Sequence, residues 1–528
     1  MSSVGSRGAG AGGAATFQRQ ATGLVREAGT LDVLVYNINF VSLGLMAALV
    51  FLFSTAFYPG ANLYATALLT FLFVLPTSLV FAFFSSAMPR SGADYVYVSR
   101  CLHPALGMMS SWNNTVWWFI YGGVPSAFFA QFGLAPFFST VGQMTGAGWL
   151  ADLGTFFASN WGTFLGGAAL IVTLVVIFSR SLKLYFRVQN ALFFVSLVSL
   201  VLTAAVWLAR PRTGIMADLG QGLGEATLRG LGESARQAGF AGGGPFSLEW
   251  TILAGTWVYI NLVFNQSSAY IGGEVRRASR LQLWSMPVAA TLSIGVLLLL
   301  LALADKAVGL ATVGRLAASE GLLFTQIAAF GSGNAVVGFL IMLCFIFQSY
   351  TWLPGQIANA SRNLLAYSID GLMPKALGEV HARWHTPVNA LVVVGAGSVA
   401  ALAAFVWVPN FATLVGIFGF ILGFMLVSAA AMAFPYRLPD VFESSPVNGR
   451  LGAVPWMTVA GALSFVALLV MAWAFLTDPS AGLNGHPGLI AMNIVIFVSG
   501  FVIYLAARAL QRRRGVDISK RFAEIPVE

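Results

Sequence analysis

Long apolar runs alternate with short polar segments along most of this chain. A helix that crosses a bilayer needs about 20 mostly apolar residues, and a window of about 19 residues moved along the sequence finds about twelve runs of that length. They lie near residues 32–57, 62–87, 106–139, 155–178, 184–208, 249–272, 284–304, 335–364, 387–408, 411–434, 455–476 and 488–508. This pattern predicts an all-α integral membrane protein with about twelve transmembrane helices.

Composition supports this fold class and excludes several functions. Hydrophobic residues fill 58% of the 528 positions and charged residues only 9%, a balance that the surface of a soluble protein could not carry. The chain has no GxxxxGK[ST] loop, so ATP hydrolysis is not expected. Cys101 and Cys344 lie beside or within apolar runs, and His381 and His385 have no third ligand nearby. We therefore expect no metal site and no cofactor.

The basic residues indicate how the chain is oriented in the membrane. With the amino terminus on the cytoplasmic side, 22 Lys and Arg fall on that side of the alternating runs and 6 on the other. Loops rich in Lys and Arg stay in the cytoplasm, so we expect a multi-pass protein of the cell membrane with both termini cytoplasmic. The net charge of +9 then reflects orientation, and no nucleic-acid partner is expected.

Two of the apolar runs contain clustered polar residues with glycine nearby. These residues are Asn37, Asn39, Ser42 and Gly44 in the first run, and Asn261, Asn265, Gln266, Ser267 and Ser268 in the sixth. The two runs are five spans apart, as corresponding helices would be in an inverted repeat of five plus five helices. Helices broken at these points would expose free amides and carbonyls to a substrate. The alternative is that these side chains only form hydrogen bonds between helices.

Several loop motifs resemble those of a known family. Residues 88–100 read MPRSGADYVYVSR and are followed by HPALG at 103–107, which resembles the loop after the second span of the amino acid-polyamine-organocation (APC) permeases. Residues 361–375 and 386–390 are similar to that family's eighth helix and the loop after it, and 273–277 to the end of its sixth helix. The resemblance implies a LeuT-type fold, with ten core helices, two peripheral ones and alternating access to a central site.

The apolar runs and the resemblance together predict a division of the chain into segments. We expect a disordered cytoplasmic tail at 1–30, a first five-helix repeat at 31–209, an extracytoplasmic loop at 210–247 with one short helix, a second five-helix repeat at 248–435, two peripheral transmembrane helices at 436–509 and a basic cytoplasmic tail at 510–528.

The expected substrate site lies between the first, third, sixth and eighth spans. Asn114 and Trp118 share one face of the third span, and Gln348 lies in the eighth. Packing between helices explains these side chains equally well. Relatives often carry Gly-Phe-Glu where this chain has Phe264, Asn265 and Gln266. A neutral amide in place of that carboxylate favours a substrate with a neutral or apolar side chain.

Ion coupling has two candidate forms. Many proton-coupled relatives carry a lysine in the fifth helix, but that place falls near Ser196 here, and no Lys or Arg lies between 188 and 209. A sodium ion between the first and eighth helices would use hydroxyls such as those of Ser349 and Thr351. The alternative is that both hydroxyls bond to their own helix backbone.

Gates are expected on both sides of the substrate site. Trp257 and Tyr259 are candidates for an outer aromatic lid, and Glu274 and Arg362 for an inner gate that approaches Tyr95 and its neighbour Asp94. The alternative for Glu274 and Arg362 is that they form solvated surface pairs worth under about 1 kcal/mol.

These observations favour a secondary transporter of an amino acid or a related small amine, coupled to H⁺ or Na⁺, with membrane lipid as its other partner. An exchanger without ion coupling and a membrane sensor that does not transport remain alternatives. An enzyme is not expected, because all four histidines lie in loops.

Overall fold

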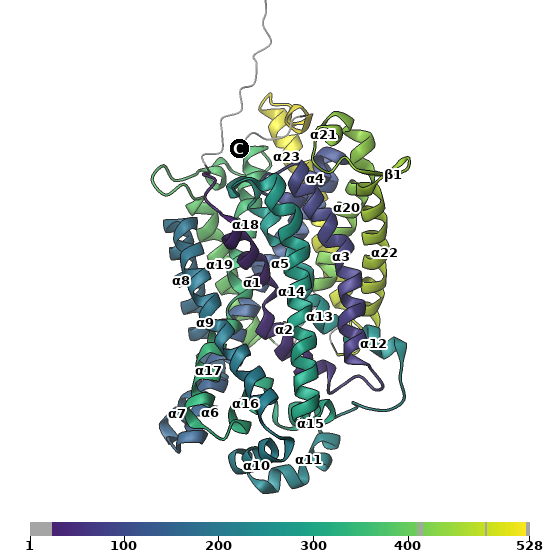
Figure 1. The fold of residues 1–528 in the computed structure, drawn as a ribbon. Coiled ribbons are helices and arrows are strands. Elements are labelled where there is room, and N and C mark those ends of the chain that lie inside the picture. The colour runs from purple at the N-terminus through teal and green to yellow at the C-terminus, as the bar shows by residue number, and fades with distance from the viewer. Residues whose placement is uncertain (1–23, 409–410, 412–415, 481–482, 524–528) are drawn as a thin grey trace, which may run out of the picture.

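The protein is a bundle of long helices that run along one common axis (Figure 1). The computed structural model describes residues 24–408, 411, 416–480 and 483–523. Within these ranges the strands form one short antiparallel pair, β1 (Arg450–Leu451) and β2 (Val454–Pro455). Eleven helices of the described chain are long and apolar enough to cross a membrane. The prediction of an all-α membrane protein is confirmed.

The eleven candidate spans follow the apolar runs of the sequence. They are Thr30–Ser54 (α1 Thr30–Val41, α2 Leu43–Leu49, η1 Val50–Ser54), α3 (Leu63–Ala87), Pro104–Thr145 (α5 Pro104–Phe128, η2 Phe129–Leu134, α6 Ala135–Thr145), α8 (Asn160–Arg180), α9 (Leu182–Ala209), α14 (Ala278–Ala307), Ala335–Ile369 (α17 Ala335–Ser349, α18 Trp352–Ile369), α19 (Val388–Trp407), α20 (Gly416–Arg437), α22 (Trp456–Thr477) and α23 (Pro487–Arg513).

The predicted run at 249–272 is absent from this set because it is divided into short pieces. These are α12 (Leu248–Ala254), α13 (Thr256–Leu262), the 3₁₀ helix η3 (Val263–Tyr270) and η4 (Gly272–Glu274). None of them alone reaches the length of a membrane span. A helix interrupted inside an apolar run is what the polar residues of this segment predicted.

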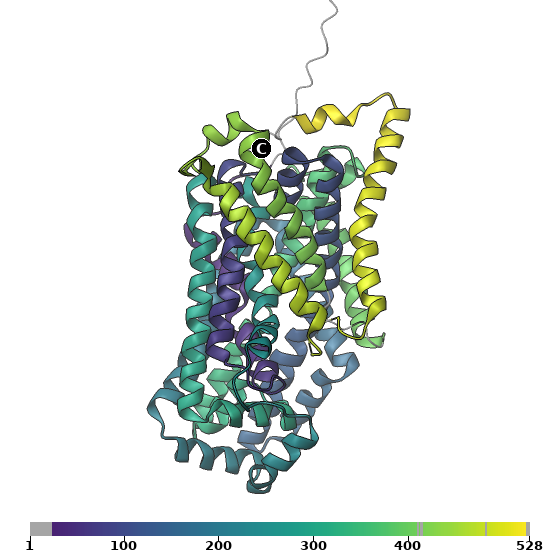
Figure 2. The same ribbon diagram turned by 90° about the vertical axis from the view of Figure 1, so that its right-hand side faces the viewer.

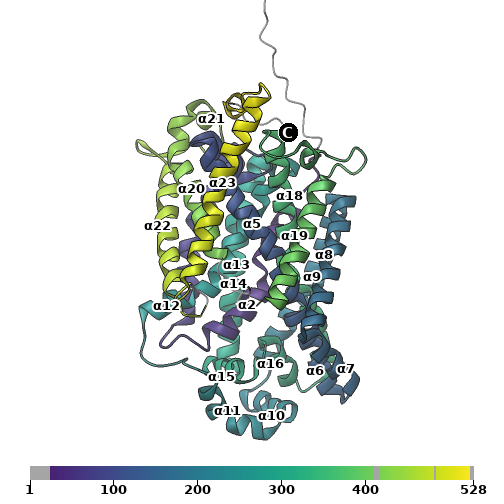
Figure 3. The same cartoon turned by 180° about the vertical axis from the view of Figure 1, so that it is seen from behind.

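Short helices cover both ends of the bundle (Figures 1 and 3). The end at the top of Figure 1, here called the α4 end, carries α4 (Ala93–Cys101), η5 (Lys375–Gly378), α21 (Pro439–Glu443) and η6 (Ile518–Ala523). The opposite end, the α10 end, carries α7 (Gly148–Ala158), α10 (Arg212–Leu223), α11 (Glu225–Gln237), α15 (Leu310–Glu320) and α16 (Phe324–Gly331). The segment 210–247 thus forms two helices, where the sequence suggested one.

The last two long helices pack on one side of the bundle. Figure 2 shows α23 as an outer column beside the other helices. It packs mainly on α5, whereas α22 packs on α3 and α20. Of the tail expected at 1–30, only residues 24–30 are among those described, and residues 524–528 of the second tail also lie outside the described chain.

Candidate functional site

The first span is interrupted at Ser42, inside the stretch that the sequence marked. Ser42 has φ 57° and ψ 80°, a left-handed conformation that is uncommon for a residue with a side chain and concentrates at functional sites. The turn ends α1 and begins α2, whose first amides point out of the helix. The Gly44 amide donates to Oε1 of Gln348 at 3.1 Å. The positive end of α2 is thus filled by a neutral side chain from α17.

Neutral oxygen atoms surround this turn. The Ser42 hydroxyl donates to the Gln348 carbonyl at 3.1 Å and accepts from Thr351 Oγ1 at 2.8 Å. Gln348 Nε2 donates to Ser196 Oγ of α9 at 2.9 Å. Ser349 instead donates to Ile346 O of its own helix at 2.8 Å. Of the two candidate sodium ligands, therefore, only Thr351 faces the interruption.

The second interruption takes the form of the tightened helix η3, not of an open break. The Ser268 amide donates to Asn37 Oδ1 of α1 at 2.9 Å, and its carbonyl accepts from Gln282 Nε2 of α14 at 2.8 Å. Asn265 Oδ1 accepts from Ser78 Oγ of α3 at 2.5 Å. Side chains on three helices therefore bond to η3, and these bonds offset the weaker backbone geometry of a 3₁₀ helix.

Several buried polar atoms near η3 have no hydrogen-bond partner among the described residues. The acceptors are Asn261 Oδ1 and Gln266 Oε1, and Tyr259 contributes its hydroxyl. On α18, the indole nitrogen of Trp352 and both polar side-chain atoms of Gln356 are also buried without a hydrogen-bond partner among the described residues. Unpaired buried polar groups are costly and call for a ligand or ordered water. They mark the region beside η3 and α18 as the candidate substrate site.

Aromatic rings fill the centre of this region. The ring of Phe264 lies 5.0 Å from Phe40 of α1, 5.0 Å from Phe420 of α20 and 6.0 Å from Trp352 of α18. Tyr121 of α5 lies 5.8 Å from Trp352. We call Phe40, Tyr121, Phe264, Trp352 and Phe420 the central aromatic cluster. Sequence reasoning missed Phe40, Trp352 and Phe420, because among 43 Phe and 14 Trp nothing distinguishes a lining ring from a packed one.

The remaining candidate residues divide between the site and its surroundings. Trp118 stacks edge-on against Tyr270 of η3 at 4.5 Å and contacts Phe420. Asn114 donates to Asp94 of α4 at 2.8 Å. Ser267 bonds to Phe264 O within η3, and Asn39 is buried on α1.

The α4 end is closed by a buried ion pair. Arg362 of α18 donates to both carboxylate oxygens of Glu274, at 2.8 and 3.1 Å, and both side chains are almost completely buried. The amides of Glu27 and Ala28 donate to the Glu274 carbonyl at 3.0 Å. Tyr95 donates to Asp370 instead, at 2.8 Å. The structure thus pairs Glu274 with Arg362 and gives Tyr95 a different partner.

The α10 end is closed by an aromatic and carboxylate network. Trp257 stacks on Phe53 at 4.0 Å and donates to the Tyr58 hydroxyl at 2.8 Å. Tyr58 and Thr256 donate to the Asp478 carboxylate at 2.8 and 2.6 Å. Burial and the Asp478 charge raise the pKa of Tyr58. We call these five residues the Asp478 cluster. Sequence reasoning missed Asp478, which at the end of an apolar run is indistinguishable from an interfacial charge.

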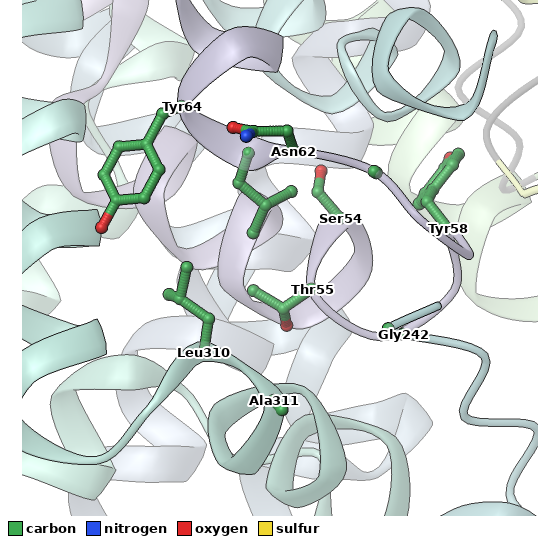
Figure 4. Close-up of a pocket in the computed structure, with 11 residues that line it drawn as sticks. Ser54, Thr55, Tyr58, Asn62, Tyr64, Gly242, Leu310 and Ala311 are labelled. Atoms are coloured by element: carbon green, nitrogen blue, oxygen red, sulfur yellow. The ribbon is translucent and has the colours of Figure 1, made fainter. Parts of the chain in front are cut away.

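A cavity of about 270 Å³ adjoins the Asp478 cluster. Figure 4 shows Tyr64 at the left and Tyr58 at the right of it, with Ser54 and Asn62 between them and Leu310 below. Tyr58 belongs to both the cavity wall and the cluster. The cavity therefore lies at the α10 end of the bundle, against the Asp478 cluster. Tyr259, the other candidate lid residue, is not among the residues that line the cavity, and its ring packs on Phe475.

Tyr58→Phe is expected to destabilise the folded protein by about 1–3 kcal/mol, because the buried Asp478 carboxylate and the Trp257 N–H each lose a partner. The measurement is the melting temperature of the purified protein in detergent. Tyr436→Phe is the control, since Tyr436 is 63% exposed and its hydroxyl can bond to water. Equal melting temperatures for the two variants would contradict a structural role for the cluster.

The site therefore combines two interrupted helices, unpaired polar atoms and a ring-lined centre, with a closed network at each end. Among the described residues, no three His, Cys, Asp or Glu side chains lie close enough to hold a metal ion. The sequence matches the family model described as amino acid permease over residues 35–501, which is most of the chain. This protein belongs to the amino acid permease family.

Proposed function

We propose that this permease carries an amino acid with an apolar side chain across the cell membrane by alternating access, with both termini in the cytoplasm. The observation that carries this proposal is the meeting of two interrupted helices, at Ser42 and in η3, around the central aromatic cluster. The α4 end is assigned to the cytoplasm because the Lys and Arg bias of the loops favours that side.

The groups at the site match the three parts of such a substrate. The Gly44 amide, at the positive end of α2, suits a carboxylate that displaces Gln348 Oε1. Asn261 Oδ1 and Gln266 Oε1 are unpaired acceptors, and these suit an ammonium group. The rings around Phe264 suit an apolar side chain. The residues in the position where relatives often carry a carboxylate are neutral, which disfavours a cationic side chain.

The two closed networks suit alternating access. Substrate would arrive past the Asp478 cluster and leave past the Glu274–Arg362 pair, and each network would open while the other stays closed. For coupling, a sodium ion would use the oxygens around Ser42 and Thr351, and a proton would need a titratable group. Exchange without an ion and sensing without transport are the competing functions.

A binding screen tests the proposed function. The purified protein is heated with each common amino acid and amine in turn, with Na⁺ and pH varied. We expect apolar amino acids to raise the melting temperature, since a ligand at 100 times its Kd stabilises the native state by about 2.7 kcal/mol. Lysine and the decarboxylated amines serve as matched controls that lack the expected fit.

Counterflow in proteoliposomes separates the alternatives. A transporter exchanges labelled for unlabelled substrate, whereas a sensor binds without flux. The uncoupled exchanger predicts that exchange is equally fast with and without Na⁺ and a pH gradient. It also predicts no net accumulation of substrate under either gradient. A screen in which no amino acid binds or exchanges would contradict the proposed function.

A further inference from the structure

Asp94 is a completely buried carboxylate at the start of α4. Its oxygens accept hydrogen bonds from Asn114 Nδ2 at 2.8 Å, Ser111 Oγ at 3.2 Å and Ser110 Oγ at 3.4 Å, all on α5. These donors are neutral. Burial disfavours the charged form of a carboxylate, whereas donated hydrogen bonds favour it, so the two effects oppose each other at Asp94.

A chain of hydroxyl groups leads from Asp94 to α18. The Tyr367 hydroxyl donates to Ser111 Oγ at 2.7 Å and lies 2.8 Å from Thr115 Oγ1. Thr115 Oγ1 also accepts from Asn363 Nδ2 at 2.9 Å. Each hydroxyl can accept one proton and donate another. Asp94 is therefore connected to the polar face of α18 by groups that can pass on a proton.

That face of α18 runs from Tyr367, where the chain of hydroxyl groups ends, to Trp352 of the central aromatic cluster. Trp352, Gln356, Asn359, Asn363 and Tyr367 recur on it at helical spacing. Among the described residues, Gln356 has no side-chain partner, and neither Asn359 Nδ2 nor Asn363 Oδ1 is bonded. Polar groups of this kind bind water when space opens beside them. This polar face of α18 thus links the candidate substrate site to Asp94.

The surroundings of Asp94 contain other ionisable groups, most of which have their own partners. Within α4 itself these groups are Tyr95, Tyr97 and Arg100. The elements that pack against α4 contribute His103 (start of α5), Tyr270 (η3), Arg362, Tyr367 and Asp370 (on or beside α18), Arg437 (end of α20) and Arg521 (η6). Arg362 bonds to Glu274, and Arg100 and Tyr95 bond to Asp370. Burial raises the pKa of Asp94 to about 7, against the lowering effect of its three side-chain hydrogen bonds.

We infer that Asp94 binds and releases the proton that is coupled to substrate movement, an inference that rests on the proposed function. A proton taken up from hydronium in the aqueous phase, which leaves water, converts the carboxylate to a carboxylic acid, which keeps one oxygen as an acceptor and gains an O–H donor. The protonated group is neutral, so its burial between α4 and α5 costs less and the two helices pack firmly. Release of the proton leaves a buried charge, which favours movement of α4 away from α5. Asp94 thereby takes the role that a lysine in the fifth helix would have, where this chain has Ser196 on α9.

Asp94→Asn tests this inference in proteoliposomes with a pH-sensitive dye inside. We expect the variant to keep substrate counterflow but to lose substrate-driven proton movement and accumulation driven by a pH gradient. Asp440→Asn, a change at an exposed carboxylate on α21, is the matched control and should behave as the wild type. A carboxyl group whose pKa is raised in the folded state stabilises that state only at pH values below the raised pKa. The wild-type melting temperature should therefore fall as pH rises through about 7. The dependence of melting temperature on pH should be weaker in Asp94→Asn.

Ser111→Ala keeps the carboxylate and provides a second test if Asp94→Asn fails to fold. Loss of a donor that lowers the pKa of Asp94 should move the pH midpoint of uptake upward by about one unit. Proton movement that persists in Asp94→Asn, or an unmoved midpoint in Ser111→Ala, would overturn the inference. So would net uptake of substrate by the wild type without any proton movement, and in that case the proposed function still stands. Absence of binding and counterflow in the wild type would instead remove the proposed function.

Discussion

Glu274→Gln is expected to destabilise the closed protein by about 3–5 kcal/mol, because it leaves the Arg362 guanidinium buried without a counter-charge. Both side chains of the pair lie at or below 2% exposure, so water cannot take over the lost contact. The same change should loosen the α4 end, since Arg362 belongs to α18 and Glu274 to the end of the interrupted sixth segment. We expect a lower melting temperature and an altered ratio of net uptake to exchange.

Glu443→Gln is the matched control for this variant. Its partner Arg450 is 44% exposed and Glu443 itself 54% exposed, so the loss should stay below about 1 kcal/mol. A double variant, Glu274→Leu with Arg362→Met, separates gating from stability, because a well-packed apolar pair often restores the stability of a buried ion pair. We expect it to recover the melting temperature but not wild-type exchange. Wild-type exchange in all these variants would contradict the inner gate.

The sequence predicted the long helices because their signal is local. Each apolar run is continuous over the length of a span, and eleven of the twelve runs form long helices in the described chain. The interruption at Ser42 was also predictable, because Asn, Ser and Gly within an apolar run disfavour a continuous series of helical backbone hydrogen bonds. The division of the chain into two inverted repeats stays a prediction.

The partners of the site residues were not predictable, because they depend on contacts between distant segments. Gln348 Oε1 reaches the Gly44 amide across 304 positions, and Tyr58 reaches Asp478 across 420. The sequence placed Asp94 and Tyr95 near Glu274 and Arg362. In the structure Asp94 bonds to α5 and Tyr95 to Asp370. The hydrogen-bond partner of each side chain depends on its rotamer and on how the helices pack, and neither can be read from a single sequence.

The form of the second interruption has the same origin. Polar residues from 265 to 268 indicated a break, but η3 keeps a helical course because side chains of neighbouring helices bond to its backbone and its amides. Gln282 lies on α14, just before the predicted run at 284–304, where nothing in the sequence marked it as a partner of η3. The difference between an open break and a tightened helix thus depends on a partner that lies 14 residues away in the chain.

Gly44→Ala is expected to abolish most substrate transport, because the added methyl group has no room. A Cβ at this position would lie 2.7 Å from Gln348 Cβ and 2.8 Å from its Cγ, with Phe345 Cε2 at 3.0 Å. Two of these atoms are near the backbone of α17 and cannot swing away, so α2 and α17 must separate. Overpacking of this kind costs about 1–3 kcal/mol, and the separation moves the Gly44 amide away from the place where the carboxylate is proposed to bind.

Gly295→Ala gives the matched control on a transmembrane helix. A Cβ there meets no atom within 4 Å, and alanine in the interior of α14 should favour the helix by up to about 1 kcal/mol. Counterflow and melting temperature should therefore fall in Gly44→Ala and stay unchanged or rise in Gly295→Ala. The proposed role of the Gly44 amide requires α2 to stay within hydrogen-bond reach of the bound carboxylate. If Gly44→Ala binds and exchanges substrate as well as Gly295→Ala does, the Gly44 amide does not hold the substrate carboxylate.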